Sequence, residues 1–239
     1  MKTLGLLGGM SWESTVLYYR AINEHVRAAR GGLHSAPLVL HSVDFETIAA
    51  LQRAGDWAAA GDALADAARG LVRAGAEAIV ICTNTMHCVA PQVQAAAGVP
   101  LLHIGDATGH ALRAAGVTRA GLLGTRFSME QPFLREHLQR HHGVHCITPD
   151  ATERDEVHRI IFDELCQGRT LPQSRASFRR IMAGLAQRGA QAVVLGCTEI
   201  GLLVDAGDAT VPLFDTTALH ARHAADWALG VETLQELHA

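Results

Sequence analysis

The chain carries its most informative stretch twice, and this repetition limits the folds that it can adopt. Residues 75–85 read G-A-E-A-I-V-I-C-T-N-T, and residues 189–200 read G-A-Q-A-V-V-L-G-C-T-E-I. Each contains a run of small and β-branched apolar residues that is typical of a buried parallel strand. When the two copies are aligned, Thr83 falls on Cys197, while Cys82 lies one residue earlier. A thiol therefore follows the predicted strand at the matching position in one copy only.

Further matches occur in the same order along the two halves. The segment G-L-L-G is found at 5–8 and again at 121–124, and V-P-L is found at 99–101 and again at 211–213. The helix predicted before each key strand also has a matching apolar face, formed by Leu64, Ala67, Ala68 and Leu71 in one copy and by Phe178, Ile181, Met182 and Leu185 in the other. Because the matches keep their order, they favour an internal duplication.

The duplicated pattern predicts an α/β fold with two pseudosymmetric lobes, each with a central parallel sheet flanked by helices. The first lobe is predicted to comprise residues 1–104 plus 216–239, with a C-terminal helix at 217–237 returning to it. The second lobe is predicted to comprise residues 105–215. In such sheets the carboxyl ends of the strands carry the ligand site, so we expect the active site in the cleft between the lobes. Strands of the first half are expected at 3–8, 37–43, 76–82 and 100–104.

Composition and charge exclude several classes of function. The 239 residues carry a net charge of −4 without charged blocks, which argues against nucleic acid or membrane-surface partners. The first residues lack a signal segment, and no run reaches the ~18 apolar residues of a membrane helix, so we expect a cytoplasmic protein. The five cysteines are an odd number without a disulfide framework and are expected to be reduced. Lys2 is the only lysine, which argues against a Schiff-base pyridoxal phosphate enzyme.

The two matching strand ends suit a racemisation. Inverting an α-carbon requires one group to remove the α-proton and another to return a proton to the opposite face. Cys197 is the candidate base, and Thr83 occupies the matching position. A free thiol has a pKa near ~8.5, and a strand-to-helix turn at Cys197 would lower that pKa through the helix N-terminus. The alternative is that Cys197 is only a small buried apolar residue.

Several motifs together resemble the aspartate/glutamate racemase superfamily. They are G-L-L-G-G-M-S-W-E-S-T near the start, C-T-N-T-M-H at 82–87 and G-C-T-E-I at 196–200, with L-H-S-V-D-F, L-L-G-T-R and I-G-L-L-V elsewhere. The resemblance is strongest to racemases specific for L-aspartate and L-glutamate, or of broad specificity. It implies a small-molecule amino acid substrate, a two-base mechanism without a cofactor, and a homodimer. No metal is expected.

The resemblance also implies roles for individual residues. Cys197 would take the proton from the L-enantiomer, and Thr83 would reprotonate directly or through water, because it stands where relatives have a second cysteine. Strand alternation points adjacent side chains to opposite faces, so Cys82 is not expected to replace that thiol. Substrate contacts are implied for Asn84, Thr85, Thr198, Met10, Gln52 and Thr125.

Four of these substrate contacts have a structural alternative. Asn84 and Thr85 would serve as turn caps, Met10 as part of the core, and the Gln52 side chain as part of a solvated helix face. With no lysine available for a distal carboxylate, Arg53 or hydroxyl groups would bind that end, or the substrate range is broad.

A group of histidines suggests a metal site only weakly. His137 and His141 are four residues apart, and His142 and His145 follow closely, but no acidic or cysteine ligands accompany them. A surface patch is therefore expected. Glu199 would either cap a helix or shape the environment of the thiol, whose pKa a nearby carboxylate would raise.

Two other functions remain open. A decarboxylase or cis–trans isomerase of the same superfamily would use one thiol to protonate a planar intermediate from one face. A two-lobed solute-binding protein without chemistry would bind its ligand even after loss of Cys197.

Overall fold

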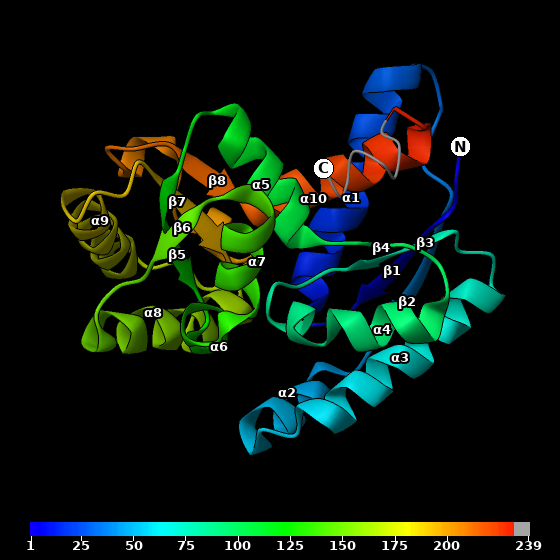
Figure 1. The fold of residues 1–239 in the computed structure, drawn as a ribbon, viewed down its shortest axis with the longest axis horizontal. Coiled ribbons are helices and arrows are strands. Elements are labelled where there is room, and N and C mark those ends of the chain that lie inside the picture. The colour runs from blue at the N-terminus through cyan, green and yellow to red at the C-terminus, as the bar shows by residue number, and fades with distance from the viewer. Residues whose placement is uncertain (232–239) are drawn as a thin grey trace. The chain divides into compact units, whose positions relative to one another are not determined.

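The computed structural model describes residues 1–231, which divide into two units with one sheet each (Figure 1). The first unit is Met1–Ile104 together with the chain from His220 onward, and the second unit is Gly105–Leu219. Residues 232–239, which include the end of the helix predicted at 217–237, lie outside the described residues. Among the helices within residues 1–231, none combines the length and apolar character that crossing a membrane requires.

The first unit contains a four-stranded parallel sheet in the order β2-β1-β3-β4. Its strands are β1 (Leu4–Gly8), β2 (Leu38–Ser42), β3 (Ala78–Ile81) and β4 (Leu101–Leu102). Its helices are α1 (Trp12–Arg30), α2 (Phe45–Ala54), α3 (Trp57–Arg73), the 3-10 helix η1 (Thr85–Val89), α4 (Ala90–Ala97) and, from His220 onward, α10 (Thr216–Leu229).

The second unit contains another four-stranded parallel sheet, in the order β6-β5-β7-β8. Its strands are β5 (Arg119–Gly124), β6 (His145–Ile147), β7 (Ala192–Gly196) and β8 (Leu213–Asp215). Its helices are α5 (Ile104–Ala114), α6 (Arg126–Glu130), α7 (Pro132–His142), α8 (Ala151–Asp163), η2 (Leu165–Gln167), α9 (Pro172–Gln187), η3 (Ile200–Leu202) and η4 (Ala206–Asp208).

The apolar helix faces predicted from the sequence form the cores. The predicted face of α3 is buried against residues of β3 such as Ile79 and Ile81, on one side of the first sheet. The matching face of α9 is buried against Val193 and Leu195 of β7. Alternate residues of β3 point the other way and pack with α1 and α10. The apolar side chains of the strands are buried against apolar helix faces, and this burial stabilises the packing of helices on each sheet.

The two sheets repeat one topology, which confirms the predicted α/β fold class. Strands β1, β2, β3 and β4 have the same order as β5, β6, β7 and β8. The registers also correspond, since Leu4 pairs with Ala78 and Ala120 pairs with Ala192.

One predicted strand is shorter than expected. Residues 100–104 form only the two-residue strand β4, and Ile104 already begins α5. The backbone N–H of Ile104 donates to His87 Nε2 at 3.1 Å. The His87 side chain therefore accepts the hydrogen bond that the Ile104 amide would otherwise donate to a neighbouring strand if β4 were longer.

Candidate active site

The carboxyl end of β3 places a polar run at the edge of the first sheet. The strand ends at Ile81, the chain bends, and η1 begins at Thr85. Thr83 is partly exposed, whereas Asn84 and Thr85 are buried. Asn84 directly precedes η1 but makes no side-chain capping hydrogen bond to it. Capping of this helix therefore does not explain an asparagine at this position.

His87 fixes the backbone beside Thr83. Its Nε2 accepts the hydrogen bond from Ile104, so the neutral ring carries its proton on Nδ1. That nitrogen lies 2.8 Å from the carbonyl oxygen of Thr83 and donates to it. His87 thus positions the loop on which Thr83 lies.

Cys82 lies in the core and not at the sheet edge. Its side chain is fully buried with Leu6, Val80 and other residues of the face that packs with α1 and α10. The Sγ atom donates to the carbonyl oxygen of Val80 at 3.8 Å. Burial raises the pKa of this thiol far above its ordinary value. Cys82 is therefore unsuited to replace a thiol at position 83, as alternation along the strand predicts.

Cys197 directly follows β7, but the predicted helix does not begin there. The chain bends through residues 197–199 into the three-residue 3-10 helix η3. Gly201 and Gly207 interrupt the following run, and each glycine costs about 1 kcal/mol in a helix interior. A single 3-10 turn lacks the aligned peptide dipoles that acidify a thiol. The expectation that a helix N-terminus lowers the pKa of Cys197 is therefore wrong.

Glu199 is the polar partner of Cys197. The buried Sγ donates to Glu199 Oε2 at 2.9 Å, and Thr198 Oγ1 donates to the same oxygen at 2.6 Å. Burial, followed by the negative charge of Glu199, raises the pKa of the Cys197 thiol well above its ordinary value. The resting group is thus a protonated thiol with a carboxylate positioned to accept its proton.

Met10 and Gln52 lie inside the first unit. Met10 is part of its hydrophobic core, together with Met86 of η1. Gln52 is 5% exposed, and its Nε2 donates to Met86 Sδ at 3.1 Å. The alternative of a solvated helix face for Gln52 is therefore wrong, because α2 turns this side chain toward the core. Met86 connects Gln52 to the run that contains Thr85.

Thr125 and Thr198 belong to the edge of the second sheet. Thr125 directly follows β5 and accepts a hydrogen bond from the Ser128 N–H at 3.2 Å as the N-cap of α6. The last residues of β5 and β7, Gly124 and Gly196, are paired. Thr125 and the Cys197 run therefore leave the sheet from neighbouring strands.

Two further charged residues are Arg53 and Asp215. Arg53 is exposed and pairs with the exposed Glu46 on its own helix. Asp215, which the sequence analysis did not single out, ends β8 beside Leu195 of β7. Burial raises the pKa of Asp215. The signal that could have identified it is an acidic residue two positions after the repeated V-P-L segment at 211–213.

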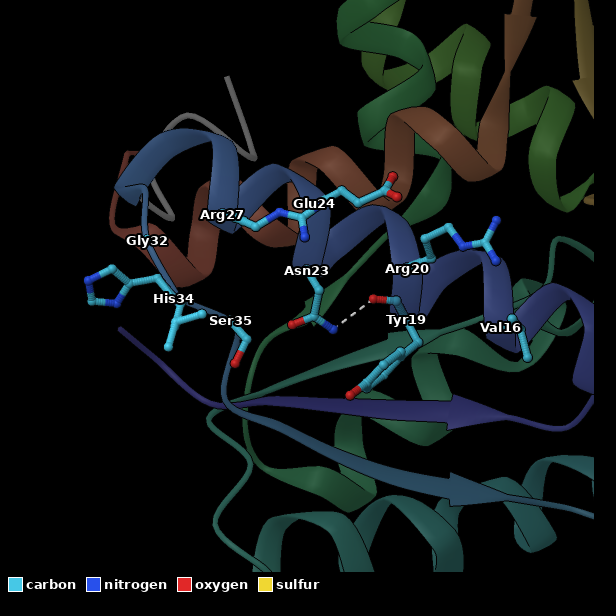
Figure 2. Close-up of a pocket in the computed structure, with 10 residues that line it drawn as sticks. Val16, Tyr19, Arg20, Asn23, Glu24, Arg27, Gly32, His34 and Ser35 are labelled. Atoms are coloured by element: carbon cyan, nitrogen blue, oxygen red, sulfur yellow. Dashed lines mark hydrogen bonds between the residues drawn. The ribbon is translucent and has the colours of Figure 1, made fainter.

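A separate surface cavity of about 530 Å³ lies along α1 and the segment after it (Figure 2). Its lining includes Tyr19, Arg20, Asn23 and His34, and Asn23 Nδ2 donates to the carbonyl oxygen of Tyr19 at 2.8 Å. None of the predicted catalytic or substrate-binding residues lines this cavity. The cavity is therefore distinct from both strand-end groups.

Comparison with known proteins identifies the family. The sequence profile of the Asp/Glu/hydantoin racemase family matches residues 7–224, which include both strand ends. The chain belongs to the Asp/Glu/hydantoin racemase family. As a member of this racemase family it is an enzyme of the isomerase class.

Solved structures agree with this assignment to the racemase family. A racemase candidate for Asp/Glu from Yersinia pestis is 56% identical and has a TM-score of 0.90, with 96% of this chain and 100% of that chain covered. An aspartate racemase homologue from Pyrococcus horikoshii OT3 is 34% identical, with a TM-score of 0.83 and coverage of 96% and 100%. The aspartate racemase of Picrophilus torridus, at 18% identity, a TM-score of 0.75 and coverage of 96% and 95%, shares the fold.

Proposed function

We propose that this chain is a cofactor-independent amino acid racemase that acts on L-aspartate or L-glutamate, or on a broader set of amino acids. The observation that carries the proposal is the hydrogen bond from the Cys197 thiol to Glu199 after β7. The matching strand end in the first unit carries Thr83. The descriptions of the Yersinia pestis and Pyrococcus horikoshii proteins support acidic amino acids as the substrate class.

Cys197 is proposed to remove the α-proton of the L-enantiomer. Because burial and Glu199 raise the pKa of the thiol, Cys197 must first give up its own proton. Glu199 already accepts this hydrogen bond and is proposed to take that proton as the thiolate forms. The positive charge of a bound substrate ammonium group would favour the thiolate further. The thiolate then takes the α-proton and leaves a planar carbanion.

Thr83 is proposed to serve the opposite face of the same carbon. A threonine hydroxyl is a much weaker acid than a thiol, so the proton returns more slowly from this side, either directly or through water. The substrate carboxylate and ammonium groups are proposed to be held by Asn84, Thr85 and Thr198, with further contacts from Met10, Gln52 and Thr125.

A deuterium-exchange assay tests this function. The protein is incubated with L- and D-aspartate and L- and D-glutamate in D₂O, followed by NMR for α-deuteration and chiral chromatography for inversion. We expect both reactions with the wild-type chain, and neither after Cys197→Ala or Cys197→Ser. A Cys197→Ala protein that racemises at the wild-type rate would overturn the proposed role of the thiol. Absence of exchange across a panel of all amino acids would overturn the racemase assignment.

One observation favours a second function. Since Cys82 lies in the core, the strand end that matches Cys197 has no thiol. A decarboxylase of malonates or a cis–trans isomerase of maleate needs one thiol to deliver a proton to one face. Release of CO₂ from malonates, or conversion of maleate to fumarate, without inversion of any amino acid would favour this alternative.

A homodimer is part of the same proposal. Helix α1 exposes Trp12, Val16 and Tyr19 at helical spacing, and the last two line the cavity of Figure 2. We expect sedimentation to give a dimer, and Val16→Glu to shift it toward monomer. A wild-type chain that sediments as a monomer at micromolar concentration would contradict this expectation.

A further inference from the structure

Histidines of α7 bond to another helix of the second unit. The Nε2 atoms of His137 and His142 lie 2.5 and 3.0 Å from Asp106 Oδ1 of α5, and the two side chains are 17% and 3% exposed. Of the four neighbouring histidines, only His141 and His145 are exposed. The expectation of a surface patch is therefore wrong for the other two, which helical geometry turns inward.

A second group of buried histidines lies at the carboxyl end of β4 in the first unit. His220 Nε2 donates to the carbonyl oxygen of Leu102 at 2.7 Å, and the Tyr18 hydroxyl donates to His220 Nδ1 at 2.9 Å. His87 Nε2 accepts from the N–H of Ile104 at 3.1 Å. Tyr18, His87 and His220 are at most 2% exposed. Helices α1 and α10 therefore fix the end of β4 to which the His87 ring is bonded.

His87 also determines the direction of the Thr83 carbonyl group. In an α-helix that oxygen would accept the N–H of residue 87, but η1 is a 3-10 helix, and the His87 N–H donates to the carbonyl of Asn84 at 3.0 Å. The His87 Nδ1–H instead donates to the Thr83 oxygen at 2.8 Å. Only the Cα–C bond separates this carbonyl group from the carbon that carries the Thr83 side chain. Holding the carbonyl therefore restricts where the hydroxyl can point.

We propose that His87 is a positioning residue for Thr83 and that its Nδ1–H controls how fast the proton returns to the substrate; this rests on the racemase function proposed above. Both ring nitrogens are bonded to backbone groups, so the ring itself is not the acid or the base. Misplacing a reacting group by about 1 Å can slow a step by about 100-fold. Loss of the bond to Thr83 should therefore slow inversion, whereas deprotonation by Cys197, which follows a strand of the other sheet, should change less.

Two substitutions separate the two hydrogen bonds of the ring. In His87→Asn the amide N–H takes the place of Nδ1 and can still donate to Thr83, whereas in His87→Gln the amide oxygen reaches the place of Nε2 and can accept from Ile104. The ratio of α-deuteration to inversion is measured in D₂O with saturating L-aspartate and L-glutamate, by NMR and chiral chromatography. We expect this ratio to rise about tenfold in His87→Gln and less than about threefold in His87→Asn. His41→Gln, at an exposed histidine of β2, should leave it unchanged.

The outcomes distinguish this role from stability and from the proposed function itself. A contribution to stability alone would affect the two His87 variants alike and slow deuteration and inversion together. That result, or an unchanged ratio in His87→Gln, would overturn the positioning role and leave the racemase proposal standing. A wild-type chain that neither exchanges nor inverts its substrates would overturn the proposed function, and the positioning role with it.

A measurement on the wild-type chain does not depend on whether these buried variants fold. The ¹⁵N NMR shifts of labelled histidine report which ring nitrogen carries the proton. We expect the neutral His87 ring to be protonated on Nδ1, because Nε2 accepts from the Ile104 amide. A His87 ring protonated on Nε2 could make neither hydrogen bond and would contradict the proposal. Circular dichroism verifies the folding of each variant.

Discussion

A buried thiol beside a carboxylate is a weaker acid than a free thiol, and this determines how Cys197 can react. Glu199 has two opposing effects on it. Its negative charge disfavours the thiolate and raises the pKa of the thiol, whereas its Oε2 atom is the acceptor to which that proton can move. A neutral isostere at position 199 removes the charge and keeps the shape, so it separates the two effects.

Glu199→Gln is expected to increase thiol reactivity and reduce racemisation. Loss of the charge lowers the pKa of Cys197, so alkylation at this residue should accelerate at a fixed pH, by about tenfold for each pKa unit. Racemisation should fall about 100-fold, because the proposed proton acceptor is lost. Peptide mass spectrometry after iodoacetamide treatment locates the modified cysteine, with Cys197→Ser as the control. If the alkylation rate and the racemisation rate both increase, Glu199 acts only by disfavouring the thiolate and is not the proton acceptor.

Thr83→Cys is expected to speed inversion by about tenfold or more, because a thiol transfers protons far better than a threonine hydroxyl. Cys82→Ala is the matched control. It removes a neighbouring thiol that faces the core, so it should leave inversion unchanged. Chiral chromatography of the product measures both variants. An inversion rate that does not rise in Thr83→Cys would count against a role for position 83 in proton return.

At the scale of elements, the end of β7, which directly precedes Cys197, lies very close to the neighbouring strand β5. A Cβ atom at Gly124 would lie 2.7 Å from the carbonyl oxygen of Gly196, at the end of β7. A backbone atom cannot move aside as a flexible side chain can. The glycine at the end of β5 therefore fixes the position from which the Cys197 loop leaves the sheet.

Gly124→Ala is expected to destabilise the chain by about 2 kcal/mol, as overpacking at a rigid contact does. It should also reduce activity, because it displaces the end of β7. Gly184→Ala is the matched control, since a Cβ atom there meets nothing within 4 Å, and alanine should stabilise α9 by up to about 1 kcal/mol. Urea unfolding measures both changes. Equal stability of the two variants would contradict the close contact.

Helix α9 is joined to η4 by a buried carboxylate. The Asp208 side chain is fully buried and accepts hydrogen bonds from Arg175 Nε at 2.8 and 2.9 Å, from Arg179, and from the Asp205 N–H at 2.9 Å. These bonds, above all those from Arg175, hold the pKa of Asp208 well below its ordinary value. The carboxylate therefore contributes to the folded state only while it is ionised.

Asp208 makes stability fall at low pH. Because its folded-state pKa lies below the unfolded value of about 3.9, its contribution is complete above about pH 5 and is lost as the pH falls toward the folded-state pKa. Asp208→Asn should cost about 2 kcal/mol at neutral pH and flatten the acid limb of the stability curve. Asp66→Asn, in an exposed ion pair with Arg69, should change little. Urea unfolding from about pH 2 to pH 7 tests both variants.

At the scale of the whole molecule, the two units repeat one fold but differ in the reactive side chain at the matching strand end. The two sheets share one strand order, yet the matching strand ends carry a hydroxyl in one unit and a thiol in the other. The two enantiomers of an amino acid have equal free energy, so the proposed racemase must have equal kcat/KM in both directions. The inequality of the two groups can therefore appear only in the path of the proton.

With L-substrate in D₂O, α-deuterium is expected to appear in remaining L-enantiomer faster than D-enantiomer forms. Cys197 can return a solvent-derived deuteron to the face it deprotonated, while delivery from the Thr83 side is slow. Combined NMR and chiral analysis of early time points measures both rates. Thr83→Cys should bring the two rates closer together. Equal rates in the wild-type chain would contradict a slow step at Thr83.

The sequence by itself determined the fold class and the matching strand ends. Apolar strand runs and helix faces such as that formed by Leu64 and Leu71 follow simple periodicities, because burial requires all apolar groups of an element to share one face. The same alternation placed Cys82 in the core. The internal duplication then aligned Thr83 with Cys197 from the sequence alone.

Only the tertiary structure decided the surroundings of these groups. The weakness of the Cys197 acid depends on burial and on the bend that brings Glu199 to its sulfur, neither of which is visible in a linear pattern. Likewise, the Gln52 side chain is buried, and the His137 ring contacts the Asp106 carboxylate of another helix. Periodicity describes which face of an element is apolar, whereas pKa values and ligand sets depend on contacts between residues that are distant in the chain.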